Sequence, residues 1–281
     1  MNVLSLFDGM SCGQIALNKL GIKVDNYFSS EIDKHAIKVT QSNYPNTKQI
    51  GSVTEVKGKD LPKIDLLIGG SPCQGFSFAG KQLNFEDDRS KLFFEFVRLL
   101  EETKPKYFLL ENVRMKQEYQ DIISEYLGVQ PIAINSRLVT YNQRKRLYWT
   151  NTPNIEQPKN LKLSIKDFIK GNSYGTIKVL KDKTRLVVES KDIHSLTARY
   201  TDLNGSGRPM IIINRDAIGK PFNYKKNNID YRMLTPIECE TLQTVPLNYT
   251  EGVSDSQRRK MLGNGWTVDV IAHIFSKIPQ M

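Results

Sequence analysis

The sequence has 281 residues, of which 39% are hydrophobic, and carries a formal net charge of +10. This length fits one large α/β domain or a main domain with a smaller one, and the hydrophobic content excludes a disordered chain. The three cysteines and three histidines lie far apart without a Cys-x-x-Cys pair, which argues against a disulfide framework or a structural metal site. No apolar run reaches the roughly 18 residues of a membrane helix and no leader pattern opens the chain, so we expect a soluble cytoplasmic protein.

Short apolar runs alternate with helical patterns from residue 1 to about residue 150: NVLSLF, GQIALNKLG, VDNYFSS, KHAIKVTQSN, IDLLIGG, SKLFFEFVRLLEE, KYFLLEN and YQDIISEYL. Such alternation predicts a doubly wound, Rossmann-like α/β domain, with a parallel sheet covered by helices on both faces. The stretch LFFEFVRLL is apolar almost all round, which favours a buried helix. A self-association face over residues 90–101, forming a homodimer, is the alternative.

Residues 151–230 have a different composition, rich in Gly, Asn, Pro and Lys around short strand-like runs such as RLVVES and PMIIIN. They contain 15 Lys and Arg against 8 Asp and Glu, an excess of 7 positive charges that indicates a polyanionic partner. Helical patterns return at TPIECETLQ and SQRRKMLGNGWTVDVIAHIFSKI. We therefore predict a catalytic and cofactor-binding domain over 1–150, a smaller basic recognition domain over 151–230, and a return to the first domain over 231–281.

Two strand ends indicate an adenosine-containing cofactor. The first strand runs into FDGMSCG, whose glycines let the backbone turn sharply and approach a ligand. The second ends in SSEID, which places Glu31 where an acidic residue accepts hydrogen bonds from a ribose diol. A nicotinamide dinucleotide stays open at this point, whereas the absence of GxxxxGK[ST] excludes a P-loop.

A thiol and a carboxylate follow two further strands. Cys73 lies in GGSPCQGFS, a turn of glycines, proline and serine that exposes the thiol, and Glu111 and Asn112 end the next strand along the chain. Because parallel strands meet at one carboxyl edge, both groups are expected in one pocket. The pair suits nucleophilic attack on a ring that must be protonated during the attack.

At these residues the sequence resembles the DNA cytosine-5 methyltransferases. The motifs FDGMSCG, SEID, GGSPCQGFS, LLENV, NQRKRLYW, YRMLTPIECETLQ and GNGWTVDVI occur in the family's order over nearly the whole chain. FDG, RSKLFFEFVRLL and GNGWTV resemble the de novo mammalian branch, whereas the short length resembles bacterial or phage enzymes. The resemblance implies S-adenosylmethionine as cofactor, no metal, double-stranded DNA as partner, and a location in bacterial cytoplasm with the nucleoid.

The resemblance also implies a mechanism. The Cys73 thiolate attacks carbon 6 of a flipped-out cytosine, after which carbon 5 takes the methyl group and S-adenosylhomocysteine is released. Glu111 shares a proton with ring N3, Arg146 reaches the base O2, and Arg144 supports the catalytic loop. Alternation puts the two arginines on one face of a strand. Asn142 stands where many relatives have glutamine and receives no role.

Several segments are implied to form the cofactor and DNA sites. The implied cofactor residues are Phe7, Asp8, Gly9, Glu31, Ile32, Val53, Pro72, Asn264, Gly265 and Trp266. Ser52 departs from the family, where an aspartate usually contacts the adenine amine. The implied DNA-binding residues are Ser77, in a loop expected to close over the base, Asn112 and Arg199. Since arginine pairs with the major-groove edge of guanine, Arg199 predicts a guanine next to the target cytosine.

Three alternatives remain at the level of sequence. A tRNA cytosine-5 methyltransferase shares these motifs, and tRNA is as anionic as DNA. An inactive DNA-binding relative is disfavoured by intact Cys73, Glu111 and Arg146. A nicotinamide dehydrogenase leaves PCQGFS and ENV unexplained.

Overall fold

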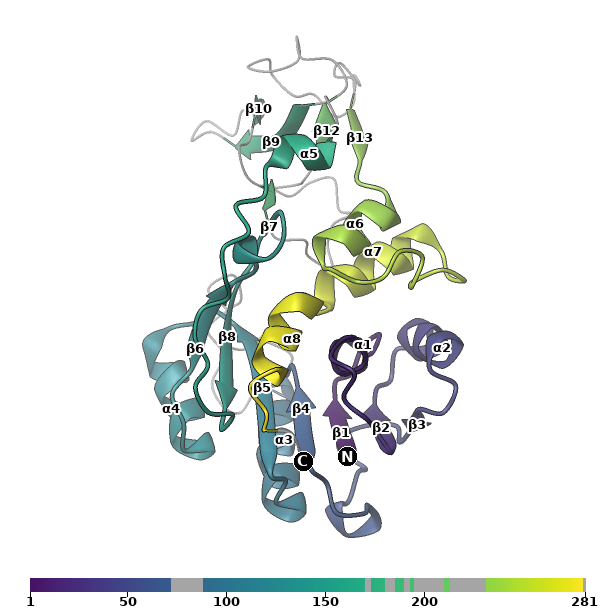
Figure 1. Cartoon of the computed structure of the whole chain (residues 1–281), viewed down its shortest axis with the longest axis vertical. Helices are drawn as coiled ribbons and strands as arrows, with labels where there is room; N and C mark the ends of the chain where they lie inside the picture. Colours follow the sequence, from purple (N-terminus) through teal and green to yellow (C-terminus); the bar gives the residue numbers. More distant parts are fainter. Residues whose placement is uncertain are drawn as a thin grey trace. The chain divides into compact units, whose positions relative to one another are not determined.

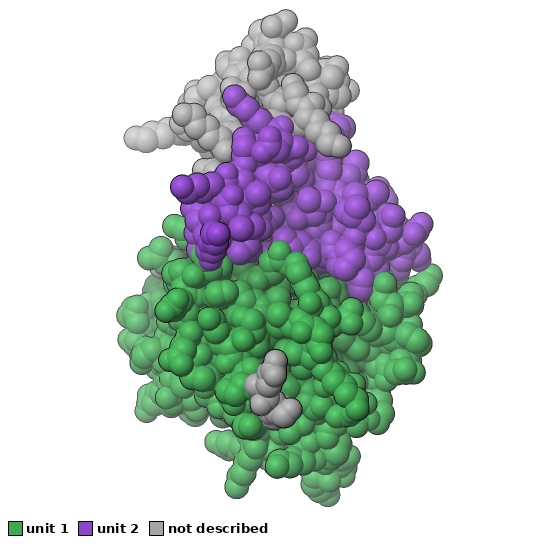
Figure 2. Space-filling view, in the orientation of Figure 1, with its two compact units in different colours: residues 1–135, 145–158, 268–281 green, residues 136–144, 159–267 purple. Residues whose placement is uncertain are grey.

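The computed structural model describes residues 1–71, 88–169, 173–179, 185–189, 193–194, 210–212 and 231–279. The chain divides into two compact units (Figure 2). Unit 1 contains residues 1–135, 145–158 and 268–281, and unit 2 contains residues 136–144 and 159–267. This division differs from the predicted one, because residues 231–267 and 136–144 belong to unit 2 and the chain returns to unit 1 only at Val268.

A seven-stranded sheet forms the centre of unit 1, in the order β3-β2-β1-β4-β5-β8-β6 (Figure 1). Its strands are β1 (Asn2–Leu6), β2 (Asn26–Ser30), β3 (Lys48–Gln49), β4 (Leu66–Gly69), β5 (Tyr107–Val113), β6 (Ile132–Asn135) and β8 (Lys145–Thr150). Strands β1 to β5 are parallel as predicted. Strand β8 runs antiparallel to β5 and β6, so the prediction of an all-parallel sheet is wrong there. The strand order reverses between β1 and β4, which is where open α/β sheets bind ligands.

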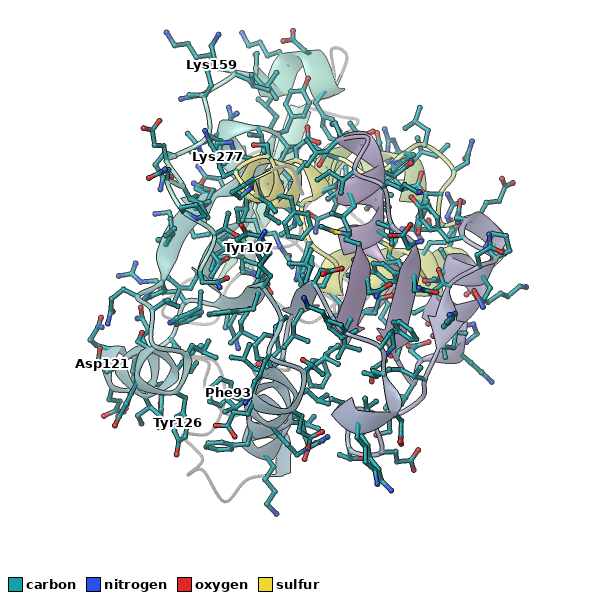
Figure 3. The ribbon with its side chains drawn as sticks, turned by 60° about the horizontal axis from the view of Figure 1, so that its bottom comes forward. Phe93, Tyr107, Asp121, Tyr126, Lys159 and Lys277 are labelled. Carbon is teal, nitrogen blue, oxygen red and sulfur yellow. The ribbon has the colours of Figure 1, made fainter. Side chains whose placement is uncertain are left out.

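Helices cover both faces of this sheet, which confirms the doubly wound fold. They are α1 (Cys12–Lys19), α2 (Lys34–Asn43), α3 (Asp88–Thr103), α4 (Gln117–Leu127) and α8 (Val268–Phe275), with a short 3-10 turn, η1 (Gly58–Asp60). Figure 3 shows α3 and α4 on one face and α1 with α8 on the other. An ion pair between Lys19 and Asp269 joins α1 to α8. The predicted packing of the C-terminal helix on the first domain is therefore confirmed for α8.

The core of unit 1 lies between the sheet and α3. Phe93, Phe96 and Leu99 of α3 are fully buried, as expected for the all-round apolar pattern of LFFEFVRLL. A Cβ atom on Gly69 of β4 would lie 3.0 Å from the Phe96 ring, so glycine lets the helix approach the strand. Because these apolar side chains are buried inside unit 1, they support no homodimer through residues 90–101. Trp149 of β8 is also buried, and its Nε1 donates to Ser124 Oγ at 2.9 Å.

Unit 2 combines a small sheet with helices. The strands β9 (Ser173–Val179), β10 (Arg185–Glu189), β12 (Met210–Ile212) and β13 (Tyr231–Met233) form an antiparallel sheet in the order β10-β9-β12-β13. This confirms the strands expected at RLVVES and PMIIIN. A two-residue parallel pair joins β7 (Asn142–Gln143) to β11 (Ile193–His194). The helical elements are η2 (Ser136–Leu138), α5 (Ile165–Ile169), α6 (Pro236–Leu242) and α7 (Asp255–Asn264).

Local sequence explains where α6 begins and α7 ends. Thr235 and Glu238 form a capping box before Pro236, a combination that satisfies free amide groups of the first turn. At the other helix, Gly265 closes the last turn by donating to the Met261 carbonyl at 2.7 Å. Within the described ranges, the chain forms no helix with the length and apolar character needed to cross a membrane.

Candidate active site and cofactor site

The turn after β1 has an unusual backbone. Phe7, Gly9 and Ser11 have φ values of +55°, +58° and +60°, in the left-handed region that side-chain-bearing residues seldom occupy. For Phe7 and Ser11 such a conformation costs on the order of 1–3 kcal/mol each and persists where surrounding contacts impose it, whereas Gly9 adopts it freely. The turn lies at the carboxyl end of β1, beside the point where the strand order reverses. Its place and its strain both fit a turn shaped to hold a ligand.

Asp8 is held by hydroxyl groups under this turn. Its carboxylate accepts hydrogen bonds from Ser5 Oγ at 2.5 Å, from Tyr27 Oη and Ser29 Oγ at 2.8 Å each, and from Ser11 Oγ. Burial raises the pKa of Asp8 above its usual 3.8, although the four hydroxyls act in the opposite direction. The side chain thus ties β1, β2 and the start of α1 together. Any contact of Asp8 with a cofactor would come from its backbone.

Glu31 links the turn after β1 to the turn after β2. Its carboxylate accepts from the backbone amides of Gly9 at 2.7 Å, Ile32 at 2.7 Å and Asp33 at 2.8 Å. A carboxylate offers about four acceptor positions, so capacity remains for a ribose hydroxyl. Next to it, the side chain of Ile32 is 78% exposed, an apolar surface of the kind on which a nucleobase packs. These two residues fit an adenosine group.

The turn after β3 contributes differently. The Val53 side chain is buried in the core, and its carbonyl accepts from Arg98 Nη2 at 3.1 Å. Ser52 Oγ lies 2.8 Å from Thr54 Oγ1, a hydrogen-bonding distance. Val53 could therefore meet a cofactor only through its remaining backbone, and the Ser52 hydroxyl is shared with a neighbour.

The ends of β4 and β5 lie side by side. Gly69 pairs with Leu110 in parallel register, which brings Ser71 beside Asn112. Asn112 is buried and donates through Nδ2 to Ser71 Oγ at 3.2 Å, while its Oδ1 accepts from the Val113 amide at 2.8 Å. Asn112, expected to bind DNA, thus fixes the residue from which the chain enters Pro72 and Cys73. Pro72, Cys73 and Ser77 themselves lie outside the described residues.

Glu111 and Arg146 form an ion pair across β5 and β8. Arg146 Nε lies 3.0 Å from Glu111 Oε1, at a distance of close contact but without the angles of a hydrogen bond. The antiparallel register pairs Val113 with Arg146, so Glu111, two residues before Val113, lies on the same face of the sheet. The two side chains are only 10% and 14% exposed. Their enclosure holds the carboxylate in one orientation.

Arg144 lies elsewhere than predicted. The strand is interrupted at this residue, between β7 and β8, so the expectation that Arg144 and Arg146 share one face of one strand is wrong. Arg144 belongs to unit 2 and donates to the carbonyl oxygens of Gly263 at 3.2 Å and Gly265 at 2.9 Å. The catalytic loop that it was expected to support lies outside the described residues.

The predicted cofactor residues Asn264, Gly265 and Trp266 belong to unit 2. Asn264 is exposed, and Gly265 and Trp266 are half-buried, at the end of α7. Arg199, the predicted reader of guanine, lies outside the described residues.

The sequence matches the profile of the C-5 cytosine-specific DNA methylases over residues 1–121 and 115–280. The chain belongs to this family. It is therefore a DNA (cytosine-5)-methyltransferase by family, and a nicotinamide dehydrogenase is excluded.

Relatives of this methylase match over nearly its whole length. It is 30% identical to the type II methyltransferase M1.ScrFI of Lactococcus lactis subsp. cremoris, covering 98% of this chain and 77% of the relative. It is 28% identical to the type II methyltransferase M.HhaI of Haemophilus parahaemolyticus, covering 98% and 93%. The solved structure of the Entamoeba histolytica methyltransferase EhMeth has a TM-score of 0.75 at 21% identity, with 98% of each chain covered. This last likeness shows the fold.

The other two cysteines of the methylase are unsuited to nucleophilic attack. Cys12 and Cys239 are both buried. Burial raises the pKa of the Cys239 thiol to about 12, so it stays protonated at neutral pH. Cys73, the predicted nucleophile, lies outside the described residues.

Gln243 is a buried residue next to the predicted cofactor segment for which the sequence indicated no role. Its side chain is fully buried, donates to the carbonyl oxygens of Leu262 at 2.8 Å and Gly265 at 3.3 Å, and accepts from Thr267 Oγ1 at 2.8 Å. Its only sequence signal is a glutamine at the end of the amphipathic stretch ECETLQ. Its partners could not be foreseen, because they lie about 20 residues further along the chain.

Proposed function

We propose that this chain transfers a methyl group from S-adenosylmethionine to carbon 5 of a cytosine flipped out of double-stranded DNA. The observation that carries the proposal is the Glu111–Arg146 pair, enclosed at the end of a strand that neighbours the strand leading into Cys73. Ser71 is bound to Asn112, and Cys73 follows two residues later. The thiol and the carboxylate thus come from adjoining strand ends.

Each residue has a defined task in this reaction. The Cys73 sulfur forms a bond to carbon 6 while Glu111 delivers a proton to ring N3, which leaves carbon 5 nucleophilic. Arg146 orients the Glu111 carboxylate and donates to the base O2. S-adenosylmethionine supplies the methyl group as an electrophile. A base then removes the carbon-5 proton, the bond between carbon 6 and sulfur breaks to return the Cys73 thiolate, and ring N3 gives its proton back to Glu111.

The cofactor is proposed to bind at the carboxyl edge of β1 and β2. Glu31 accepts from the ribose hydroxyls, Ile32 packs on the adenine, and the backbone of Phe7, Asp8 and Gly9 lies along the methionine part. Supporting this are the three amides that fix the Glu31 carboxylate and the exposure of Ile32. Val53 of the same unit, and by the family resemblance Pro72, Asn264, Gly265 and Trp266, are proposed as further cofactor residues.

Unit 2 is proposed to hold the DNA. Its residues 159–230 contain 15 Lys and Arg against 7 Asp and Glu, an excess of 8 positive charges that would bind phosphate groups and make the affinity for DNA fall with salt. Arg199 is proposed to read a guanine beside the target cytosine. Such an enzyme works in the cytoplasm, at the DNA of a bacterium or of an infecting phage.

A mechanism-based trap tests the proposal. In a duplex with 5-fluorocytosine, carbon 5 has no proton to lose after methylation, so elimination stops and the protein stays bonded to DNA. We expect wild type and Cys239→Ala to form this adduct in the presence of S-adenosylmethionine, and Cys73→Ala to form none. Peptide mass mapping should place the DNA on Cys73. Adduct formation by Cys73→Ala would refute the assignment.

A competing RNA substrate is tested in the same assay. If tRNA with 5-fluorocytosine is trapped and duplex DNA is not, the substrate is RNA, although the cysteine chemistry stands. If neither is trapped while the cofactor binds, the chain is an inactive relative.

A further inference from the structure

A closed ring of buried polar contacts surrounds the end of α7. Arg144 donates through Nη1 to the Gly263 carbonyl at 3.2 Å and through Nη2 to the Gly265 carbonyl at 2.9 Å. The guanidinium is almost fully buried. Carbonyl groups in the last turn of a helix lack partners within the helix, and the negative end of the helix dipole favours a cation. Arg144 therefore satisfies the C-terminus of α7 both by hydrogen bonding and by charge.

Gln243 reaches the same segment from α6. It donates to Leu262 O at 2.8 Å and to Gly265 O at 3.3 Å, so the Gly265 carbonyl is shared by Gln243 and an arginine. Thr267 Oγ1 donates to Gln243 Oε1 at 2.8 Å, and Ser136 Oγ donates to Thr267 Oγ1 at 2.9 Å. Gln243, Thr267 and Ser136 are all buried.

The backbone closes this ring. The Ser136 amide donates to the Arg144 carbonyl at 3.0 Å, which links the last member of the chain of contacts to the first. Every contact of the ring lies within unit 2. The ring holds residues 262–265 from one side and Thr267 from the other, so the backbone on both sides of Trp266 is fixed.

We infer that Arg144 and Gln243 are positioning residues for the cofactor segment Asn264–Trp266. This rests on the proposed function, in which that segment lines the S-adenosylmethionine site. The two arginines of NQRKR then serve different ligands: Arg146 faces the carboxylate that works on the base, whereas Arg144 acts on the cofactor through the end of α7.

A set of arginine variants tests this assignment. Arg144→Lys keeps the charge but loses the planar fork that serves two carbonyls at once. We expect it to raise the Kd for S-adenosylhomocysteine and the KM for S-adenosylmethionine about tenfold, with duplex affinity and kcat within about twofold of wild type. Arg146→Lys should show the reverse, a lower kcat with an unchanged Kd for S-adenosylhomocysteine.

Arg137 provides the matched control. It lies in the same unit and donates to the carbonyl oxygens of Leu163 at 2.7 Å and Thr140 at 3.4 Å, neither of which belongs to the ring. Arg137→Lys should leave the Kd for S-adenosylhomocysteine unchanged. If Arg137→Lys weakens it as much as Arg144→Lys does, or if Arg144→Lys leaves it unchanged and lowers kcat or duplex affinity, the inference is overturned.

A second variant guards against misfolding. Should Arg144→Lys lose its cooperative thermal transition, Gln243→Met, which removes the donor to Leu262 and Gly265 at nearly equal volume, carries the same expectation. Loss of S-adenosylhomocysteine binding by the wild type itself would refute the proposed function, whereas normal binding by wild type, Arg144→Lys and Gln243→Met would refute only the positioning role.

Discussion

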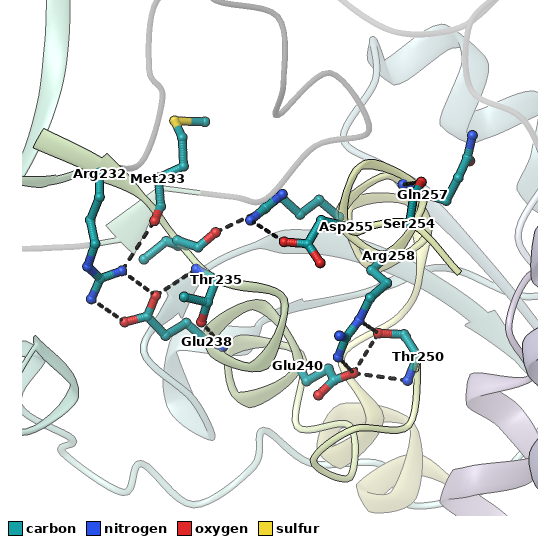
Figure 4. Close-up of polar contacts among 12 residues, drawn as sticks. Arg232, Met233, Thr235, Glu238, Glu240, Thr250, Ser254, Asp255, Gln257 and Arg258 are labelled. Carbon is teal, nitrogen blue, oxygen red and sulfur yellow. Dashed lines mark hydrogen bonds and ion pairs between the residues drawn. The ribbon is translucent and has the colours of Figure 1, made fainter. Parts of the chain in front are cut away.

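Two glutamates of α6, Glu238 and Glu240, are two residues apart but occupy different environments (Figure 4). The Glu240 side chain is fully buried, whereas that of Glu238 is 21% exposed. Replacing each by glutamine keeps the shape and removes the charge. Comparing the two variants therefore measures how burial of a carboxylate in this unit changes its contribution to the free energy of unfolding.

The structure sets the expected magnitudes. Glu240 Oε1 accepts from the Thr250 amide at 2.9 Å, from Thr250 Oγ1 at 2.5 Å and from Arg258 Nη2 at 3.1 Å, and Oε2 accepts from the Asn248 amide at 2.7 Å. Glutamine would leave the half-buried Arg258 without its counter-ion and turn an NH₂ group toward an N–H donor. Breaking a buried pair in this way costs about 3–5 kcal/mol.

Glu238 should cost less. Its partner Arg232 is 40% exposed, and exposed pairs contribute about 0–1 kcal/mol, while glutamine keeps the side-chain oxygen that the capping box needs at this position. We expect Glu240→Gln to lower the free energy of unfolding by at least about 2 kcal/mol more than Glu238→Gln does. Urea unfolding followed by circular dichroism and by fluorescence of Trp266, in the same unit, measures both. Equal losses for the two variants would refute this account of α6.

Three further variants have expectations that follow from single residues. Burial raises the pKa of Asp8 above 3.8, so the stabilisation from its protonated form is complete below that pH and is lost as the pH rises through the folded-state pKa. The free energy of unfolding of Asp8→Asn should therefore increase relative to that of wild type as the pH rises. A pH-independent difference in urea unfolding would contradict this. Asn142 is buried, and its carboxamide has no hydrogen-bond partner among the residues that the structure describes. Asn142→Leu should therefore leave thermal stability equal or raise it by up to about 1 kcal/mol, and a clear drop in the melting temperature would contradict this. Ile32→Ala should weaken S-adenosylhomocysteine binding about fivefold in calorimetry without affecting stability, because roughly 1 kcal/mol of apolar contact with the ligand is lost. The control Leu247→Ala, at another exposed apolar residue, should leave S-adenosylhomocysteine binding unchanged.

Local pattern predicted four parallel strands of unit 1, β1, β2, β4 and β5, and the helices α1 to α3, because each of these strands is an apolar run with a turn signal behind it. The two-residue strand β3 is polar and was not predicted. The same logic placed Glu31 and Glu111 at strand ends. Strand β8 could not be oriented in this way, since KRLYWT has the composition of a strand in either direction. Its antiparallel pairing with β5 depends on the return path of the chain.

The roles of Asp8 and Arg144 depend on tertiary contacts that local sequence pattern does not determine. Asp8 looked like a ligand-facing residue because it lies in a turn, but hydroxyls from β1, β2 and the turn before α1 occupy its carboxylate. Arg144 looked like one of two equivalent arginines until the contact with α7, some 120 residues later, set it apart. The partners of Arg144 leave no signal near it in the sequence, and of the partners of Asp8 only Ser5 and Ser11 are close to it in the sequence.

Transfer of labelled methyl from S-adenosylmethionine to unmethylated duplex DNA tests the central claim most directly, with wild type, Cys73→Ala and Cys239→Ala compared and the product base identified by mass. The account predicts 5-methylcytosine with wild type and Cys239→Ala and none with Cys73→Ala. Label on another base, or 5-methylcytosine formed by Cys73→Ala, would contradict it.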